Sequence, residues 1–338
     1  MDLKTLCELN GTSGDEGAVR RAILDAARPL CDSVRIDRMG NVIAFKKGRT
    51  GSHRILFSAN MDEIGFIILD ATEDGLLQFR PIGNIDPRDA VSKYVLVGEK
   101  RVPGVIGALA IHLQSDEQYD RVLDYESLYI DIGAKSRDDA LEDCPKGCYA
   151  YYDSGYEEFG EGFVVSKALD SRAGCCTMLR MMEKQYDADV TYAFVTQKEV
   201  GMRGALGAAF DAQADDVIVL GCTAAADIRG TDKGLKIYEA GMGVAVSFMD
   251  RTSIADAELY RTLMDLAEEK RILHQARRDT AGISDSGSYQ LSREGMRTCV
   301  LSVPCRYIHG PSEVVKLSDV EAQYELADAF AGSQQLPH

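Results

Sequence analysis

The sequence predicts an α/β protein whose doubly wound sheet is interrupted by a small all-β domain. Strand-like segments such as TYAFVTQ alternate with helix-like segments such as RGALGAAF, which is typical of a sheet with helices on both faces. From about residue 66 to residue 161, short β-rich pieces follow one another and helical periodicity is scarce. We therefore expect residues 1–65 and 162–338 to form the α/β domain, and residues 66–161 to form the inserted domain.

The first predicted elements are a helix, a hairpin and a short strand. Ser13, with Glu16 three residues later, resembles a capping box and predicts a helix that continues to about Leu30. The segment SVRIDRMGNVIAFKKG predicts a hairpin that turns at Gly40-Asn41. A short apolar strand, ILFSA, follows the hairpin and leads directly to Asn60.

The inserted segment is predicted to be a succession of short strands. Its pieces include IGFIILDATEDGLLQFRPIG, KYVLVGEKRVPGVIGALA, SLYIDIGA and CYAYYDSG, and turns such as Glu73-Asp74-Gly75 separate its apolar runs. Helical periodicity returns only in SRDDALEDC. Short strands separated by turns favour a small β domain of barrel-like form.

Helices and strands alternate again in the last part of the chain. The segment SKALDSRAGCCTMLRMMEKQ predicts a helix with Asp170 near its start, and a long helix is predicted from about residue 253 to residue 271. With the strands between them, these helices complete the pattern of a doubly wound sheet.

Several strands are predicted to end at residues with functional side chains or at a glycine. TYAFVTQ leads into Lys198 and Glu199, DDVIVLG ends at Gly221, and TCVLSVP leads to the loop that holds His309. In open α/β sheets, ligands bind along the edge formed by the carboxyl ends of the strands. We therefore expect these residues, together with Asn60, to line one cleft.

Composition and charge exclude several functional classes. The 338-residue chain has 38 basic and 54 acidic residues, a net charge of −16 and a pI of about 4.8, which argues against nucleic acid and anionic membranes as partners. No stretch is typical of a signal peptide, and no apolar run reaches the ~18 residues of a membrane span. Nine cysteines without regular spacing are typical of a reduced, cytoplasmic protein.

Three residues have the chemistry of metal ligands. Asp170, Glu199 and His309 belong to the residue types that bind zinc, cobalt or manganese. Their spacing alone is a weak signal, because an aspartate at a helix start is usually an N-cap and a histidine in a loop is usually an ordinary polar residue. Residue type and spacing alone therefore favour a structural role.

Seven segments spread over nearly the whole chain carry a family resemblance. They are ANMDEIGF, RPIGNIDPR, VPGVIG, LYIDIGA, KALDSRAG, TQKEVGMRGA and LSREGMRTCVLSVPCRYIHGPSEVV. In these segments the chain is similar to metallopeptidase family 42, the tetrahedral or glutamyl aminopeptidases, some of which are named cellulase or endoglucanase. The resemblance implies a mixed sheet of the zinc-aminopeptidase type around a two-metal centre. It also implies an inserted β domain used in assembly, often into twelve-subunit particles.

The resemblance also assigns roles to residues. It implies that one ion is held by a histidine, a bridging aspartate and a second aspartate, and the other by the bridging aspartate, a glutamate and a C-terminal histidine. A second glutamate is the general base. Asp170 matches the bridging aspartate, Glu199 the ligand glutamate and His309 the C-terminal histidine. Asp62 matches the aspartate that orients the first ligand. Asp285, in GISDSGS, matches an aspartate near the site that either supports the ligands or caps a turn.

Three positions depart from the family pattern. Asn60 replaces the first histidine, Gly221 the second aspartate and Lys198 the general base. The first two changes remove ligands from the same metal position. A lysine, with an ordinary pKa of about 10.4, is positively charged at pH 7, so it repels a metal ion and takes no proton from water. We therefore expect Lys198 to bind Asp170 in place of the missing ion. At most one ion of zinc, cobalt or manganese should bind per chain, or none.

Three functional hypotheses follow from these matches and departures. The first is an aminopeptidase homologue that acts on or binds peptide N-termini, with impaired or lost two-metal activity, which would make it a pseudoenzyme. The second is an active mono-metal hydrolase of altered specificity, and the third is a glycoside hydrolase of the endoglucanase type. The expected partners are peptides or other small ligands, with neither nucleic acid nor membrane. The family resemblance implies self-assembly into dimers and dodecamers.

Overall fold

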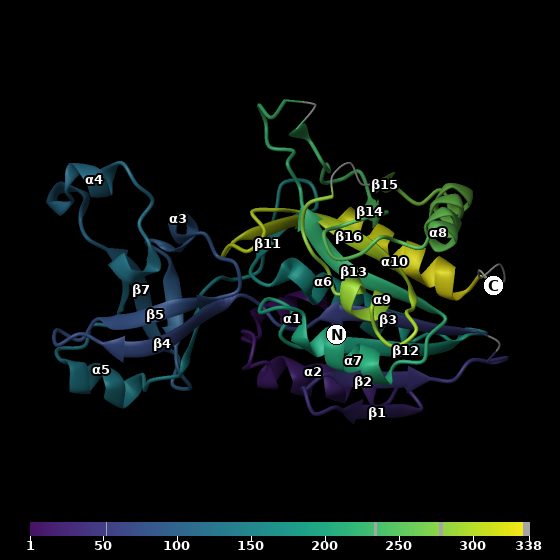
Figure 1. Cartoon of the computed structure of the whole chain (residues 1–338), viewed down its shortest axis with the longest axis horizontal. Helices are drawn as coiled ribbons and strands as arrows, with labels where there is room; N and C mark the ends of the chain where they lie inside the picture. The colour runs from purple at the N-terminus through teal and green to yellow at the C-terminus, as the bar shows by residue number, and fades with distance from the viewer. Residues whose placement is uncertain (52, 233–234, 277–279, 334–338) are drawn as a thin grey trace.

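The computed structural model describes residues 1–51, 53–232, 235–276 and 280–333. Within these residues, an 11-stranded sheet forms the body of the molecule and a closed six-stranded barrel lies to one side of it (Figure 1). The main path of the sheet runs through β1 (Ser33–Ile36), β2 (Val42–Lys46), β12 (Asp189–Val195), β3 (Arg54–Asn60), β13 (Asp216–Ala224), β16 (Arg297–Arg306), β17 (Glu313–Lys316), β11 (Phe163–Ser166) and β10 (Glu157–Phe159). Strand β14 (Val244–Ser247) pairs with β16 and with β15 (His274–Ala276).

The centre of the sheet is parallel and its two ends are antiparallel. Strands β12, β3, β13 and β16 run in the same direction, whereas β1, β2, β17, β11 and β10 join through antiparallel ladders. Parallel neighbours need crossover connections, and helices provide most of them here. The predicted fold class, a doubly wound mixed sheet with an inserted barrel-like domain, is confirmed.

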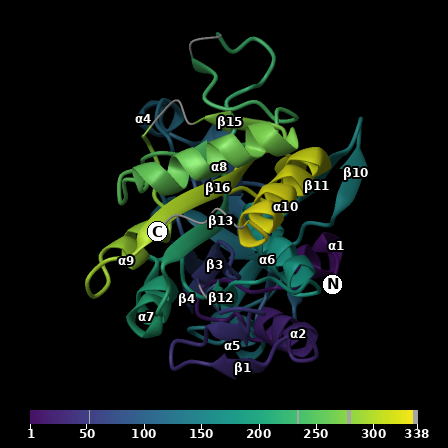
Figure 2. The same cartoon turned by 90° about the vertical axis from the view of Figure 1, so that its right-hand side faces the viewer.

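Helices cover both faces of the sheet because successive side chains on its strands point to opposite faces. In β3, Phe57 packs into a core with α2 (Gly17–Ala27), α6 (Leu169–Met181), α8 (Ala257–Lys270) and α10 (Leu317–Ala331). Its neighbour Leu56 packs into a second core with α7 (Arg203–Asp211) and α9 (Ser286–Gln290). Figure 2 shows α8 and α10 crossing in front of the sheet. The short α1 (Leu3–Glu8) packs against α6 through Leu3 and Cys7.

The barrel is closed by strands that are all antiparallel. In order around it they are β4 (Gly65–Ala71), β5 (Leu77–Ile82), β8 (Leu128–Asp131), β7 (Val102–Ala108), β6 (Tyr94–Val97) and β9 (Tyr149–Tyr152). Its core centres on Phe66, which packs edge-on against Phe79 and Tyr152. Its helical segments are α3 (Pro87–Ala90), η1 (Ile111–Leu113), α4 (Asp116–Tyr119), η2 (Tyr125–Ser127) and α5 (Arg137–Asp143). The domain limit at residue 161 stays a prediction, since β10 lies within the 66–161 segment yet pairs with the large sheet.

Two local predictions differ from the structure. No capping box forms at the start of α2, because its N-cap residue is Glu16 and makes no side-chain cap bond. The Ser13 hydroxyl instead donates a 2.6 Å hydrogen bond to Asp62 Oδ2. Strand β13 also continues past Gly221 to Ala224, because it stays paired with β16 over that length. Gly221 therefore lies within a strand and not at its end.

Among the helices of the described residues, none has the length and apolar character required to cross a membrane.

Candidate active site

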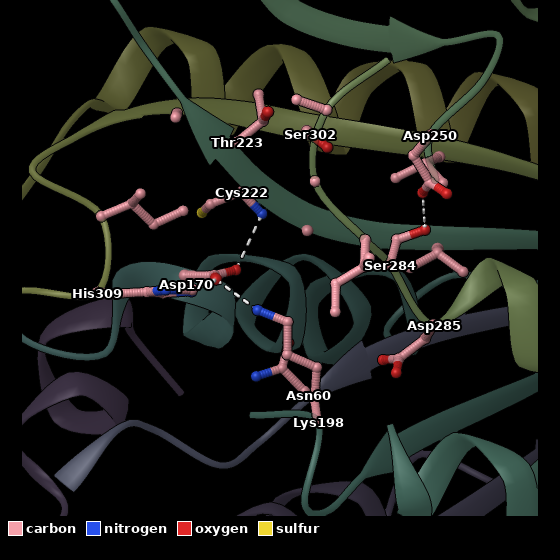
Figure 3. A pocket seen from close by; sticks show the side chains of 18 of the residues that line it. Asn60, Asp170, Lys198, Cys222, Thr223, Asp250, Ser284, Asp285, Ser302 and His309 are labelled. Atoms are coloured by element: carbon pink, nitrogen blue, oxygen red, sulfur yellow. Dashed lines mark hydrogen bonds and ion pairs between the residues drawn. The ribbon is translucent and has the colours of Figure 1, made fainter. Parts of the chain in front are cut away.

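The residues predicted to share a cleft lie together along one edge of the parallel strands. Asn60 ends β3, and Lys198 and Glu199 follow β12, which pairs beside β3. Asp170 lies at the start of α6, and His309 lies in the loop between β16 and β17. These residues line a cleft of about 500 Å³ (Figure 3). The chain therefore brings distant positions together as the sheet geometry predicts.

The Lys198 ammonium lies between two carboxylates. Its Nζ is 2.7 Å from Asp170 Oδ2 and 2.8 Å from Glu199 Oε1, and both carboxylate side chains are about 4% exposed. Burial acts to lower the pKa of Lys198, but the charges of Asp170 and Glu199 outweigh it and raise the pKa well above its ordinary value. Lys198 is therefore a cation at neutral pH and cannot accept a proton.

His309 faces the same two carboxylates. Its Nε2 is 3.6 Å from Asp170 Oδ2 and 3.5 Å from Glu199 Oε2. Burial acts to lower the pKa of His309, and its interaction with Asp170 and the charge of Glu199 outweigh burial and raise the pKa. For Asp170, burial acts to raise the pKa, and Lys198 and His309 together hold it well below its ordinary range. Asp170 is therefore ionised and interacts with both basic side chains.

Asn60 and Gly221, which stand where the family resemblance implies two metal ligands, offer no ligand atom of the implied kind. The Asn60 amide donates a 3.2 Å hydrogen bond to the backbone carbonyl of Asp62, and Gly221 supplies no side chain. A Cβ atom at Gly221 would meet only Ser302 Oγ, at 3.9 Å, so space is open there. Asp170 Oδ1 accepts a 3.3 Å hydrogen bond from the Cys222 backbone N–H.

Glu313 is a site residue that the sequence analysis missed. Its carboxylate accepts hydrogen bonds from the backbone N–H groups of Asp170 and His309, both at 3.0 Å. Glu313 therefore fixes the segment that carries Asp170 relative to the loop that carries His309. Burial, together with the charge of Asp170, raises the pKa of Glu313 to about 8. The available signal was an acidic residue in the apolar segment SEVV, four residues after His309.

Asp62 holds the backbone of Glu199 in place through a hydrogen bond. Its Oδ2 accepts hydrogen bonds from Ser13 Oγ and, at 3.1 Å, from the Glu199 backbone N–H. Burial, with the charge of Glu199, raises the pKa of Asp62 to about 7. The orienting role that the resemblance implies for Asp62 stays a prediction, since Asn60, the residue it would orient, bonds the Asp62 backbone instead.

Left-handed backbone conformations occur at and next to the site. Of the nine non-glycine residues with positive φ values in the described part of the chain, three lie there: Ala168 (60°), two residues before Asp170, Gln197 (54°), directly before Lys198, and His309 itself (62°). Each such conformation costs on the order of 1–3 kcal/mol and persists only where the surrounding structure enforces it. The surrounding structure therefore holds the backbone in these conformations close to Asp170, Lys198 and His309.

In the described part of the chain, one group of donors is close enough together to hold a metal ion. Asp170, Glu199 and His309 offer ligand atoms that all lie within 4.8 Å of one another, and carboxylate and imidazole donors suit zinc, cobalt or manganese. The ammonium of Lys198 is bonded to two of these three ligands, so an ion there has to compete with it.

A doubly wound sheet with a carboxylate–histidine cluster at its carboxyl edge is an arrangement suited to a metal-dependent hydrolase. Comparisons with known proteins identify which one. The family model described as M42 glutamyl aminopeptidase matches residues 40–326, and the chain belongs to that family. The family prediction is thus confirmed.

Three relatives illustrate the similarity. The lysyl aminopeptidase of Pyrococcus furiosus is 30% identical, over 97% of this chain and 95% of its own. The solved aminopeptidase of Desulfurococcus kamchatkensis is 32% identical with a TM-score of 0.93, and 98% of this chain and 93% of that chain are covered. The TET1 peptidase of Pyrococcus horikoshii, described as assembling into a tetrahedron or a large octahedral shell, is 31% identical with a TM-score of 0.87 and 98% coverage of both chains.

Proposed function

We propose that this chain is an aminopeptidase homologue that binds peptide N-termini and whose two-metal peptidase activity is impaired or lost. One observation carries the proposal, which is that the Lys198 ammonium bridges Asp170 and Glu199. A bridging cation neutralises the carboxylates that a two-metal centre needs, and it repels any ion that approaches them. It also occupies the sequence position of the general base.

The remaining donors support at most one ion. If zinc, cobalt or manganese binds, Asp170, Glu199 and His309 are the residues that would hold it, and the ion would supply Lewis-acid chemistry toward a carbonyl and a water. Asp170 would keep its Cys222 hydrogen bond, and Glu313 would keep both loops in place. Lys198, being protonated, takes no proton from the attacking water. A peptide is therefore bound and oriented, but its hydrolysis lacks a base.

The mono-metal hydrolase is the second candidate, favoured by the closeness of the same three donors. Two measurements test the proposal, and the second of them separates the two candidates. Elemental analysis after loading with excess zinc, cobalt or manganese should give no more than one ion per chain. Hydrolysis of a panel of aminoacyl p-nitroanilides should be at least about a hundredfold slower than by an active family member. The reason is that general-base catalysis accelerates a reaction by roughly 10²–10⁴-fold. Anomalous scattering from two full ions roughly 3.5–4 Å apart would contradict the proposal. Soluble β-glucans, added to the panel, test the glycosidase hypothesis.

We also propose that the chain assembles through its barrel. The barrel carries exposed apolar side chains at Tyr94, Ile111, Leu113 and Tyr119, each more than 60% exposed. Exposed apolar side chains of this kind are available for contact with another copy of the chain, and the TET1 peptidase of P. horikoshii can assemble into a tetrahedron or a large octahedral shell.

Light scattering should therefore give a mass of at least twice 37.0 kDa, with the dodecamer as the family-like outcome. The variant Ile111→Glu is expected to lower that mass, because it puts a charge into an apolar contact. Ile254→Glu, at a similarly exposed apolar residue outside the barrel, is the matched control and should leave the mass unchanged. A monomer mass across micromolar concentrations would refute assembly.

A further inference from the structure

Asp285 is a buried carboxylate that the proposed chemistry does not use. It lines the same cleft as Lys198, at the N-terminal end of α9, and it is only 3% exposed. Asp285 does not cap the turn with its side chain, because that side chain makes no cap hydrogen bond. Among the described residues, no group forms a hydrogen bond with Asp285 Oδ1. Figure 3 shows the carboxylate turned toward the side of the cleft where Lys198 lies.

A set of short hydrogen bonds fixes the loop around Asp285. Ser284 Oγ donates to Asp250 Oδ2 at 2.6 Å, and Ser286 Oγ is 2.6 Å from Ser284 Oγ and 2.5 Å from Ser253 Oγ. The residues on both sides of Asp285 are thus bonded within the protein. The backbone therefore presents the Asp285 side chain in one direction, with one carboxylate oxygen left without a partner.

Burial of an unpaired carboxylate costs several kcal/mol unless a partner compensates it. The charged groups that face Asp285 are Lys198, Asp62, Glu199 and Asp170. Lys198, the cation among them, is bonded to two other carboxylates. Burial, only partly opposed by Lys198, raises the pKa of Asp285 to about 7. A cationic group of a ligand is the partner that this environment lacks.

We propose that Asp285 accepts a hydrogen bond from the primary ammonium group of a ligand in this cleft. The lining of the same cleft includes the apolar residues Val219, Leu220, Ile283 and Val300. The class of ligand is therefore an α-ammonium next to an apolar side chain, as in a peptide with an apolar N-terminal residue. The inference rests on the proposed binding of N-termini and deepens it, because a carboxylate of the protein recognises the amine.

Calorimetric titration of the full chain tests this with two small probes. L-Leucinamide carries the ammonium group, and 4-methylpentanamide has the same skeleton without it. At pH 7.4, we expect leucinamide to bind the unmodified chain at least tenfold more tightly than 4-methylpentanamide. In Asp285→Asn, leucinamide should lose about tenfold to hundredfold in affinity, the range of a hydrogen bond to a charged group, while 4-methylpentanamide should change less than threefold. Glu325→Gln, which removes an exposed charge on α10, is the matched control and should change neither.

Each outcome decides between the two proposals. If Asp285→Asn binds leucinamide as tightly as the unmodified chain does, the assignment to Asp285 is wrong and binding of N-termini stands. If the unmodified chain binds neither leucinamide nor a leucyl peptide, the proposed function fails as well. Should the variant not fold, the unmodified chain still decides, because equal affinity for the two probes would overturn ammonium recognition.

Discussion

The combined variant Asn60→His, Lys198→Glu, Gly221→Asp is expected to acquire aminopeptidase activity at least about a hundredfold above that of the unmodified chain when loaded with zinc. The three changes supply the missing ligands and a general base, and they remove the ammonium that repels the ion. The substitution at Gly221 is sterically open, because this glycine does not have a positive φ and a Cβ atom there lies 3.9 Å from its nearest neighbour.

Partial combinations should restore far less. Lys198→Glu alone adds a base, but the metal position at which Asn60 and Gly221 replace two ligands stays without them. Asn60→His with Gly221→Asp adds ligands but keeps the ammonium 2.7 Å from Asp170. We expect each to stay within about tenfold of the unmodified chain, since residues that act as one catalytic unit are strongly non-additive.

The rates are to be measured on aminoacyl p-nitroanilides together with zinc content and circular dichroism of each variant. A folded, zinc-loaded triple variant without activity would show that the substrate pocket has changed too. Efficient peptidase activity of the unmodified chain would be more damaging, because it would overturn the interpretation of Lys198.

The single variant Lys198→Met is expected to lower the free energy of unfolding by about 3–5 kcal/mol in the absence of metal, the cost of leaving buried charges without their partner. Methionine keeps the length of the side chain and removes the ammonium from Asp170 and Glu199, whose side chains are about 4% exposed. Urea unfolding at pH 7 measures the difference. The matched control is Lys100→Met, which breaks a 2.6 Å ion pair with Asp143 in which the lysine is 64% exposed. Exposed pairs contribute less than about 1 kcal/mol.

The pH dependence of this difference follows from the pKa of Asp170. Lys198 and His309 hold that pKa below its ordinary value of 3.8, so the ion pair stabilises the folded chain above about pH 4 and its contribution is lost as the pH falls further. On the alkaline side, the pKa of Lys198 is raised above its ordinary 10.5, so the contribution persists through neutral pH and is lost only at high pH. The unmodified chain and Lys198→Met should therefore differ most from about pH 5 to pH 9 and converge in acid.

Zinc should partly reverse the loss in Lys198→Met. Removing the ammonium leaves Asp170, Glu199 and His309 free to hold an ion, and a ligand at a thousand times its Kd stabilises a folded state by about 4 kcal/mol. Zinc should therefore raise the melting temperature of Lys198→Met more than that of the unmodified chain. An equal shift in both proteins would mean that Lys198 does not compete with metal.

Much of the fold was predictable because local pattern and sheet geometry agree. Apolar strands that end at Asn60 and lead into Lys198 predicted a shared edge, and β3 and β12 pair side by side as that prediction requires. The contact between Lys198 and Asp170 was likewise predictable, because an ammonium and a carboxylate at the same edge of a sheet attract each other. Figure 3 shows the result.

Other parts of the site depend on tertiary contacts that no local pattern shows. The capping-box prediction at Ser13 was wrong because Asp62, 49 residues away, takes the Ser13 hydroxyl as a donor. Glu313 was missed because its partners are two backbone N–H groups, one of them 143 residues away. Such bonds become visible only once the loops are placed in space.

The positive charge that balances Asp170 and Glu199 in this cleft comes from a side chain of the protein, Lys198. Clustered carboxylates repel one another unless a cation lies among them. Here the ammonium of Lys198 is covalently attached and lies 2.7 Å from Asp170 and 2.8 Å from Glu199, so dilution cannot remove it. The charge balance of Asp170 and Glu199 therefore does not depend on a bound divalent cation.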